Sequence, residues 1–185
     1  MPLVSILMPV RDDLRTLPDC LESIQKQSLK DWELVAVDDG SSDGSGEFLL
    51  ETAAKDSRIR VLRERPRGIV AALNSGLAAC AGSYVARMDA DDRMRPERLE
   101  IQLAFLQRET QVDFCGSRVE PFTEEGPVSE NVQRYHDWSN SLLTDDEIRR
   151  DLFAESPIMH PTFFGPRKLY EFLGGYQEQP WAEDY

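Results

Sequence analysis

Apolar residues in this chain gather into short runs, each followed by a polar turn. Nearly continuous apolar runs of this length are typical of strands covered on both faces, as in a parallel sheet. They predict strands at residues 3–10, 32–37, 59–62, 84–88 and 112–117, and a later one at residues 161–164.

Between these runs, apolar residues recur every three or four positions, which places them on one face of a helix. Helices are expected to begin near Thr16, after the turn at residues 38–45, at Gly68 and at Pro96. Gly82 is a typical residue for ending the third of these helices. Strand and helix therefore alternate with short links, which predicts an α/β domain with right-handed crossovers.

The alternation stops after residue 122. Residues 123–138 are polar and irregular, and they are interpreted as a loop or a marginal hairpin. A capping box at residues 144–147 predicts a short helix to Phe153, and a helical turn over residues 168–173 should end at Gly174 and Gly175.

Length and charge narrow the classes of function. The chain has 185 residues, enough for one domain with a sizeable core. Its net charge of -13 argues against nucleic acid and against docking on an anionic membrane. No apolar run reaches the length of a membrane span, and no signal peptide is apparent. Three scattered cysteines predict free thiols in a reducing cytoplasm rather than a disulfide framework or a zinc site.

The main chemical signal follows the strand at residues 84–88. Asp89, Asp91 and Asp92 place three carboxylates in four residues, where they repel one another unless a cation is present. Oxygen-rich sites of this kind typically bind a hard divalent cation such as Mg²⁺ or Mn²⁺. The alternative is an acidic turn in which Asp91 or Asp92 caps the helix near Pro96. This stretch alone leaves both interpretations open.

Polar endings also follow two other predicted strands, at Pro9 and Val10 and at Asp38 and Asp39. In a parallel sheet the carboxyl ends of strands lie at one edge, where ligands bind. A capped helix start explains the 38–41 turn equally well by itself. The joint pattern is more specific than either part, and it predicts one shared crevice.

These motifs resemble the family 2 glycosyltransferases of the GT-A fold, over essentially the whole chain. The resemblance lies in the segments at residues 6–10, 37–43, 68–77 and 88–92, in His160-Pro161 and in residues 183–185. It implies a GT-A, Rossmann-like mixed sheet flanked by helices, and an inverting, metal-dependent transfer of sugar from a nucleotide-diphosphate donor to a hydroxyl acceptor. The donor is expected to be UDP-linked, the acceptor a saccharide or lipid-linked saccharide, and the setting cell-surface polysaccharide or lipopolysaccharide assembly in the cytoplasm or at the inner membrane face.

The resemblance also assigns roles to residues. The nucleotide-binding positions are Pro9, Val10, Arg11, Asp38, Asp39, Gly68, Asp89 and Ala90. Metal ligands are expected at Asp91, Asp92 and His160, and the catalytic base at Asp184. Glu183, Gly174 and Gly175 are candidates for the acceptor side.

Structural alternatives accompany several of these roles. Without the resemblance, His160 is an ordinary histidine of an extended segment, and Glu183 and Asp184 are a solvated pair. Gly174 and Gly175 are first of all a helix stop. Asn74, in the predicted helix, is interpreted as structural.

The sequence also departs from the family pattern. Alanines occupy the part of the 68–80 helix where the family often carries a basic residue, so Arg65 or Arg67 takes that role or nothing does. The chain is interpreted as one GT-A domain truncated at its C-terminal end, with a nucleotide-binding half at residues 1–118 and the start of the acceptor half at residues 119–185. Two rival functions stay open: a silent nucleotide-sugar-binding module, and a nucleotidyltransferase.

Overall fold

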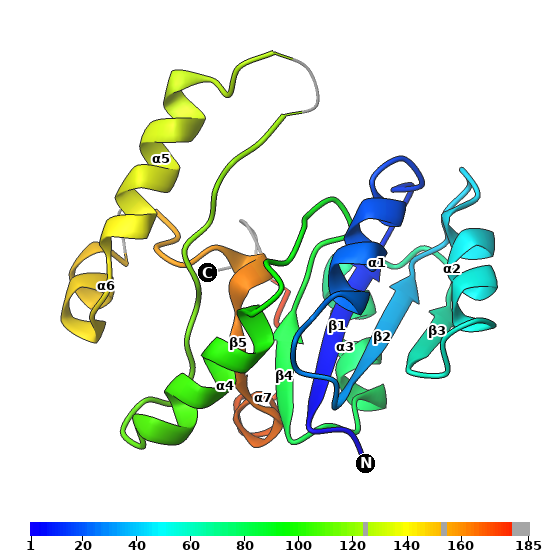
Figure 1. The fold of residues 1–185 in the computed structure, drawn as a ribbon, viewed down its shortest axis with the longest axis horizontal. Helices are drawn as coiled ribbons and strands as arrows, with labels where there is room; N and C mark the ends of the chain where they lie inside the picture. The colour runs from blue at the N-terminus through cyan, green and yellow to red at the C-terminus, as the bar shows by residue number, and fades with distance from the viewer. Residues whose placement is uncertain (124–125, 153–154, 179–185) are drawn as a thin grey trace.

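The computed structural model describes residues 1–123, 126–152 and 155–178. Its centre is a five-stranded sheet in the order β3-β2-β1-β4-β5 (Figure 1). The strands are β1 (Val4–Val10), β2 (Trp32–Asp38), β3 (Ile59–Arg63), β4 (Tyr84–Arg87) and β5 (Phe164–Pro166). The first four are parallel, and β5 runs antiparallel to β4.

Helices cover both faces of this sheet. The helices are α1 (Leu17–Gln25), α2 (Ser45–Ala53), α3 (Ile69–Ala79), α4 (Arg98–Arg108), α5 (Glu130–Ser141), α6 (Asp145–Asp151) and α7 (Arg167–Leu173). Leucines of α1, α2 and α4 pack with Ile6 and Leu34 on one face, while Leu73 of α3 packs with Leu7 and Val35 on the other. Burial on both faces explains why β1 and β2 are apolar almost throughout.

Tyr170 of α7 also packs against the cluster of Leu7 and Val35, whereas α5 and α6 lie apart from the sheet on the side of β5 (Figure 1). Ser139 of α5 donates a hydrogen bond from Oγ to the carbonyl of Pro157 at 2.9 Å, and the Tyr135 hydroxyl donates to the carbonyl of Ser156 at 2.9 Å. Thr144 and Glu147 form the predicted capping box of α6. The first two contacts fix α5 to the segment that leads into β5.

Three predicted elements differ from the structure. Residues 112–117 are not a strand, since only Cys115 forms a bridge, to Phe164; Val112 and Phe114 remain 38% and 39% exposed, so longer pairing would bury little. Residues 123–138 contain most of α5, whose polar sequence hid the helix and whose N-cap Ser129 accepts a hydrogen bond from the Val132 N–H.

The third difference concerns residues 161–164. A single 3₁₀ turn, η1 (His160–Thr162), occupies the start of that segment, and the strand begins only at Phe164. Pro161 lacks an N–H and has a fixed φ, which suits the first turn of a helix better than a sheet ladder.

The contact of α3 with the sheet depends on a glycine. A Cβ at Gly76 would lie 2.3 Å from Leu7 Cδ1 and 2.8 Å from Val37 Cγ2. In a free helix, Gly→Ala gains about 1 kcal/mol of propensity. Overpacking a filled core costs about 1–3 kcal/mol, which outweighs that gain at this position.

Gly76→Ala is therefore expected to lower the free energy of unfolding by about 1 kcal/mol or more, because overpacking exceeds the propensity gain. Urea unfolding measures the change. Ala78→Gly, at an exposed position of the same helix, serves as the control for propensity alone and should also lose about 1 kcal/mol. A more stable Gly76→Ala protein would show that α3 can move away from the sheet.

Candidate active site

The ends of three parallel strands form the site. Val10 of β1 is in register with Asp38 of β2, and Leu7 of β1 with Arg87 of β4. The Asp39 N–H donates to the Val10 carbonyl at 3.0 Å just beyond the paired strands. Because all three strands run in the same direction, the residues that follow them lie at the same edge of the sheet.

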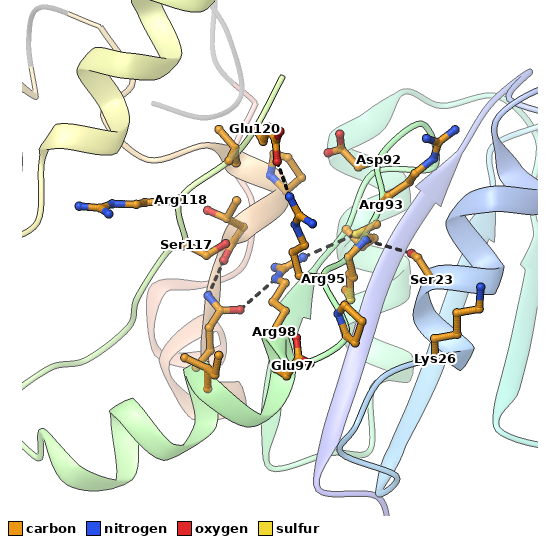
Figure 2. A pocket seen from close by; sticks show the side chains of 18 of the residues that line it. Ser23, Lys26, Asp92, Arg93, Arg95, Glu97, Arg98, Ser117, Arg118 and Glu120 are labelled. Carbon is orange, nitrogen blue, oxygen red and sulfur yellow. Dashed lines mark hydrogen bonds and ion pairs between the residues drawn. The ribbon is translucent and has the colours of Figure 1, made fainter. Parts of the chain in front are cut away.

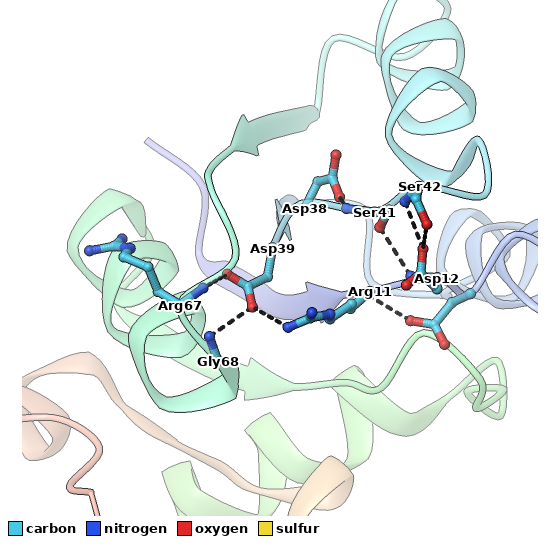
Figure 3. Close-up of polar contacts among 9 residues, drawn as sticks. Arg11, Asp12, Asp38, Asp39, Ser41, Ser42, Arg67 and Gly68 are labelled. Atoms are coloured by element: carbon cyan, nitrogen blue, oxygen red, sulfur yellow. Dashed lines mark hydrogen bonds and ion pairs between the residues drawn. The ribbon is translucent and has the colours of Figure 1, made fainter.

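Asp39 is held at the beginning of α3. Its carboxylate is 3% exposed and accepts hydrogen bonds from the backbone N–H groups of Arg67 at 2.8 Å and Gly68 at 2.9 Å (Figure 3). Arg11 Nη1 lies 3.5 Å from Asp39 Oδ2. Gly68 has a φ of 91°, a conformation that favours glycine. The structure thus brings Arg11, Asp39 and Gly68 together, as the resemblance implied.

Asp38 points to a different place. Its carboxylate accepts from the Ser41 N–H at 2.8 Å and from Arg63 Nε at 3.2 Å, and its side chain is 1% exposed. These partners hold the turn after β2 and tie it to β3. In this conformation the Asp38 carboxylate makes its hydrogen bonds to other residues of the protein, although the resemblance assigned it to nucleotide binding.

The loop after β1 is tied to the loop after β2. Asp12 has a φ of 58° and accepts from the Ser42 N–H at 2.7 Å, while its own N–H donates to Ser41 Oγ at 3.1 Å (Figure 3). The next residue, Asp13, has its pKa raised, mainly by burial and then by the charges of Asp91, Asp43 and Asp89. Asp13, in the loop after β1, is therefore within range of the charges in the turn after β2 and of the carboxylates after β4.

Those carboxylates form a compact group. Asp89, Asp91 and Asp92 each offer an oxygen, and these atoms lie within 4.8 Å of one another. Glu97, not Asp91 or Asp92, occupies the N-cap of α4, so the capping interpretation of these two residues does not hold. Burial, and then Asp89 and Asp91, raise the pKa of Asp92 to about 6. An all-oxygen, anionic donor set fits a hard ion such as Mg²⁺ or Mn²⁺.

Arg87 is a residue that the sequence prediction overlooked. It is 1% exposed, and its Nη1 lies 2.5 Å from Asp89 Oδ1. A signal was present in the sequence: an arginine in an otherwise apolar strand, two positions before the first aspartate and so on the same side.

His160 lies in an aromatic environment. It is 7% exposed, and its ring centroid is 5.1 Å from that of Phe163 and 5.6 Å from that of Tyr176. Burial, helped by the charge of Arg87, lowers its pKa to about 3, so it is neutral at pH 7. Among the described residues, the compact ligand group consists of the three aspartates and does not include His160.

The candidates for the acceptor side have structural contacts. Gly174 and Gly175 both have a φ of 78°, and Gly174 ends α7. Asn74 of α3 accepts from the Tyr176 N–H at 2.9 Å and donates from Nδ2 to the Tyr176 carbonyl at 2.8 Å. This pair of hydrogen bonds docks the turn on α3 and gives Asn74 the expected structural role. Glu183 and Asp184 lie outside the described residues.

Two cavities open beside the carboxylates that follow β4. One, of about 940 Å³, is bounded by α1, by the β4–α4 connection with Asp92, by α4 and by residues 117–122 (Figure 2). The other, of about 610 Å³, includes Asp91 and Asp92 and is closed by Val132 and His136 of α5. Their volumes are in the range of small-molecule sites.

The sheet and the helices on its two faces have the arrangement of the GT-A fold. A TarS fragment from S. aureus, solved with UDP, superposes with a TM-score of 0.76 at 20% identity, covering 100% of this chain and 53% of that one. A mannosyltransferase from Pyrobaculum calidifontis, solved with GDP-Man and Mn²⁺, has a TM-score of 0.75 at 24% identity, covering 99% and 50%. At these identities the likeness establishes the fold.

The family model described as "Glycosyl transferase family 2" matches residues 5–174. The chain belongs to this family. An uncharacterized glycosyltransferase of Haemophilus influenzae is 30% identical over 189 residues, covering 100% of this chain and 58% of that protein. The O-antigen biosynthesis protein RfbC of Myxococcus xanthus is 37% identical over 184 residues, covering 89% and 14%. The chain therefore spans little more than half the length of the first relative.

A bilayer crossing needs a long apolar helix, and none of the helices in residues 1–123, 126–152 and 155–178 meets that requirement.

Burial of neutral His160 should make stability depend on pH. Its pKa is about 3 in the folded protein and about 6.5 when unfolded. Between these values only the unfolded chain binds the proton, so the contribution is complete above about pH 6.5 and is lost as the pH falls. The slope approaches about 1.4 kcal/mol per pH unit.

His160→Gln is expected to remove this slope. Between pH 7 and pH 5 the wild-type protein should lose about 2 kcal/mol more unfolding free energy than the variant. Urea titrations at pH 5, 6 and 7 measure both curves. Parallel curves would show that folding does not lower the pKa of His160.

Proposed function

We propose that this domain transfers a sugar from a nucleoside-diphosphate donor to a hydroxyl acceptor, with metal dependence and inversion at the anomeric carbon. The observation that carries the proposal is the meeting of two unlike sites at one sheet edge. Asp39 is a buried carboxylate held by the N–H groups of Arg67 and Gly68, and Asp89, Asp91 and Asp92 form a compact anionic group. A nucleoside diphosphate has a base and a pyrophosphate that match such a pair.

The two sites divide the work of donor binding. Asp39, with Arg11 beside it, faces the base of the nucleotide, and Asp89 meets both its ribose and the divalent cation. Asp91 and Asp92 hold the divalent cation. When bound, this ion stabilises the negative charge that develops on the diphosphate as it leaves. In a chain of net charge -13, the cation also makes a phosphate-bearing ligand electrostatically acceptable.

The chain's own contribution to bond formation is proton removal. The acceptor oxygen forms a bond to the anomeric carbon while the bond from that carbon to the diphosphate oxygen breaks. The proton of the acceptor hydroxyl passes to the carboxylate of Asp184. One displacement without a covalent intermediate inverts the anomeric centre. A positioned base of this kind is typically worth about 10²–10⁴-fold in rate.

A uridine nucleotide is the proposed donor, and a saccharide or lipid-linked saccharide of the cell surface is the proposed acceptor. The TarS complex with UDP and the O-antigen biosynthesis relative support these choices. The manganese and GDP-Man of the Pyrobaculum enzyme support a divalent cation, and they make GDP-mannose the first alternative donor to test.

The rival functions make different demands on the site. A nucleotidyltransferase needs a glycine-rich, basic phosphate loop after the first strand, and residues 11–14 contain no glycine. A silent binding module would bind UDP and Mn²⁺ without turnover in the full-length protein. Transfer assays with a donor panel distinguish this module from an active enzyme.

Asp91→Asn is expected to weaken Mn²⁺-dependent nucleotide binding at least tenfold, because the metal loses an anionic ligand. The readout is the rise in melting temperature with UDP plus Mn²⁺ over that with either alone. Asp31→Asn, an exposed aspartate just before β2, is the matched control. Equal shifts in Asp91→Asn and wild type, with and without chelator, would remove Asp91 from the metal site.

Asp184→Asn is expected to lower turnover in the full-length protein about 10²–10⁴-fold while donor affinity stays within twofold, because a base acts on the acceptor proton and not on the donor. Steady-state transfer and calorimetric donor binding measure the two quantities. Glu178→Gln is a control in the same part of the chain. A parallel loss of binding and turnover would indicate a structural role for Asp184.

A further inference from the structure

Arg87 is a buried cation in an environment that otherwise does not favour one. It lies at the end of β4, and its side chain is 1% exposed. It shares a sheet face with Val85, which packs in the cluster that includes Tyr170 and Tyr176. Both tyrosines are neutral at pH 7, and burial raises their pKa further; the nearby His160 is neutral because burial lowers its pKa. A charge placed in such surroundings is costly unless it is paired.

The charge of Arg87 is paired with Asp89, the first residue of the carboxylate group. Nη1 lies 2.5 Å from Asp89 Oδ1. Neither Nη1 nor Nε has a well-aligned hydrogen-bond partner among the described residues. The contact is therefore mainly a charge–charge contact at short range, strengthened by the low local dielectric.

The main chain fixes Arg87 from two sides. Its N–H donates to the Phe163 carbonyl at 2.8 Å, and its carbonyl accepts from Arg98 Nη2 at 2.9 Å. The guanidinium is thus attached to a strand end that the sheet, η1 and α4 all hold in place. Asp89, by contrast, follows the strand and is 31% exposed. The rigid partner in the pair is Arg87, and the residue it can restrain is Asp89.

We propose that Arg87 is a positioning residue: its buried guanidinium sets the direction of the Asp89 carboxylate and balances the charge of the Asp89–Asp91–Asp92 group. Together, a divalent ion and Arg87 carry as many positive charges as three ionised aspartates carry negative ones. The inference deepens the proposed function and rests on it. Residues that orient metal-site carboxylates from behind typically change metal affinity 10–100-fold when they are replaced.

The pair predicts an unequal effect on stability. Asp89→Asn leaves a buried arginine uncompensated, so its melting temperature should fall by on the order of 10 °C. Arg87→Met leaves a half-exposed aspartate and fills an apolar site, so it should cost much less. The double variant Arg87→Met/Asp89→Asn should melt above Asp89→Asn alone. This measurement needs no ligand and no activity.

The pair also predicts a change in ligand binding. In the presence of saturating UDP, Arg87→Met should bind Mn²⁺ about tenfold or more weakly than wild type, and Arg87→Lys, which keeps the charge without the planar fork, should fall between them. Glu33→Gln is the matched control. Glu33 is a buried carboxylate in β2 that accepts from Ser5 Oγ at 2.6 Å, and its loss should lower stability without changing Mn²⁺ affinity.

The outcomes separate the two proposals. Wild-type protein that binds no Mn²⁺ with UDP or with GDP would overturn the proposed metal-dependent function and this inference together. Wild-type binding with an unchanged Mn²⁺ affinity in Arg87→Met would overturn the role of Arg87 alone and leave the proposed function standing. A double variant no more stable than Asp89→Asn would show that Asp89 does not neutralise Arg87, which also overturns the inference.

Discussion

Electrostatic repulsion among Asp89, Asp91 and Asp92 is the constraint around which this edge of the molecule is arranged. Oxygens of the three side chains lie within 4.8 Å of one another, a separation at which like charges raise each other's pKa. Burial, and then the charges of Asp89 and Asp91, raise the pKa of Asp92 to about 6. The fold tolerates the group because rigid elements hold it: β4 before it, α4 after it, and Arg87 and Arg98 behind it.

The nucleotide side shows the opposite arrangement, because its charges are already satisfied by the protein. Asp39 receives two backbone N–H groups at the start of α3, and Asp38 is neutralised by Arg63 and the Ser41 N–H. These bonds hold both carboxylates in place. Carboxylates held by protein groups on one side, and three crowded carboxylates on the other, are a physical basis for the division proposed above, in which protein atoms recognise the base and a cation mediates the contact with the phosphates.

The cavities beyond Asp92 have walls from a different part of the chain. Residues 117–122 and α5 close them, and these segments belong to the region where the strand and helix alternation stops. These walls therefore come from the part of the chain where the sequence pattern predicted the elements least well, and they lie beside Asp91 and Asp92.

The sequence alone determined the class of fold and predicted which strand ends share one edge of the sheet. Continuous apolar runs require a sheet covered on both faces, and glycine and capping residues mark where most of its helices begin, so β1 to β4, α1 to α4 and α6 could be predicted locally. The end of α3 was predicted wrongly, because Cys80 in an extended conformation ends that helix and Gly82 has no positive φ. Because parallel strands end at one edge, Asp39 and the Asp89–Asp92 turn could be brought together without coordinates. The family assignment then followed from the same residues.

Tertiary structure decided the rest, because the outcome depended on contacts between residues distant in sequence. Asp38 and Asp39 are equivalent in a motif, yet alternation along the chain turns one to Arg63 and the other to Gly68. The polar sequence of α5 gave little indication of a helix. Residues 112–117 form a single β-bridge, between Cys115 and Phe164, where a whole strand was predicted. His160 became a buried neutral ring through Phe163 and Tyr176. Only the fold shows that the Arg87 side chain is buried and that its charge is paired with Asp89.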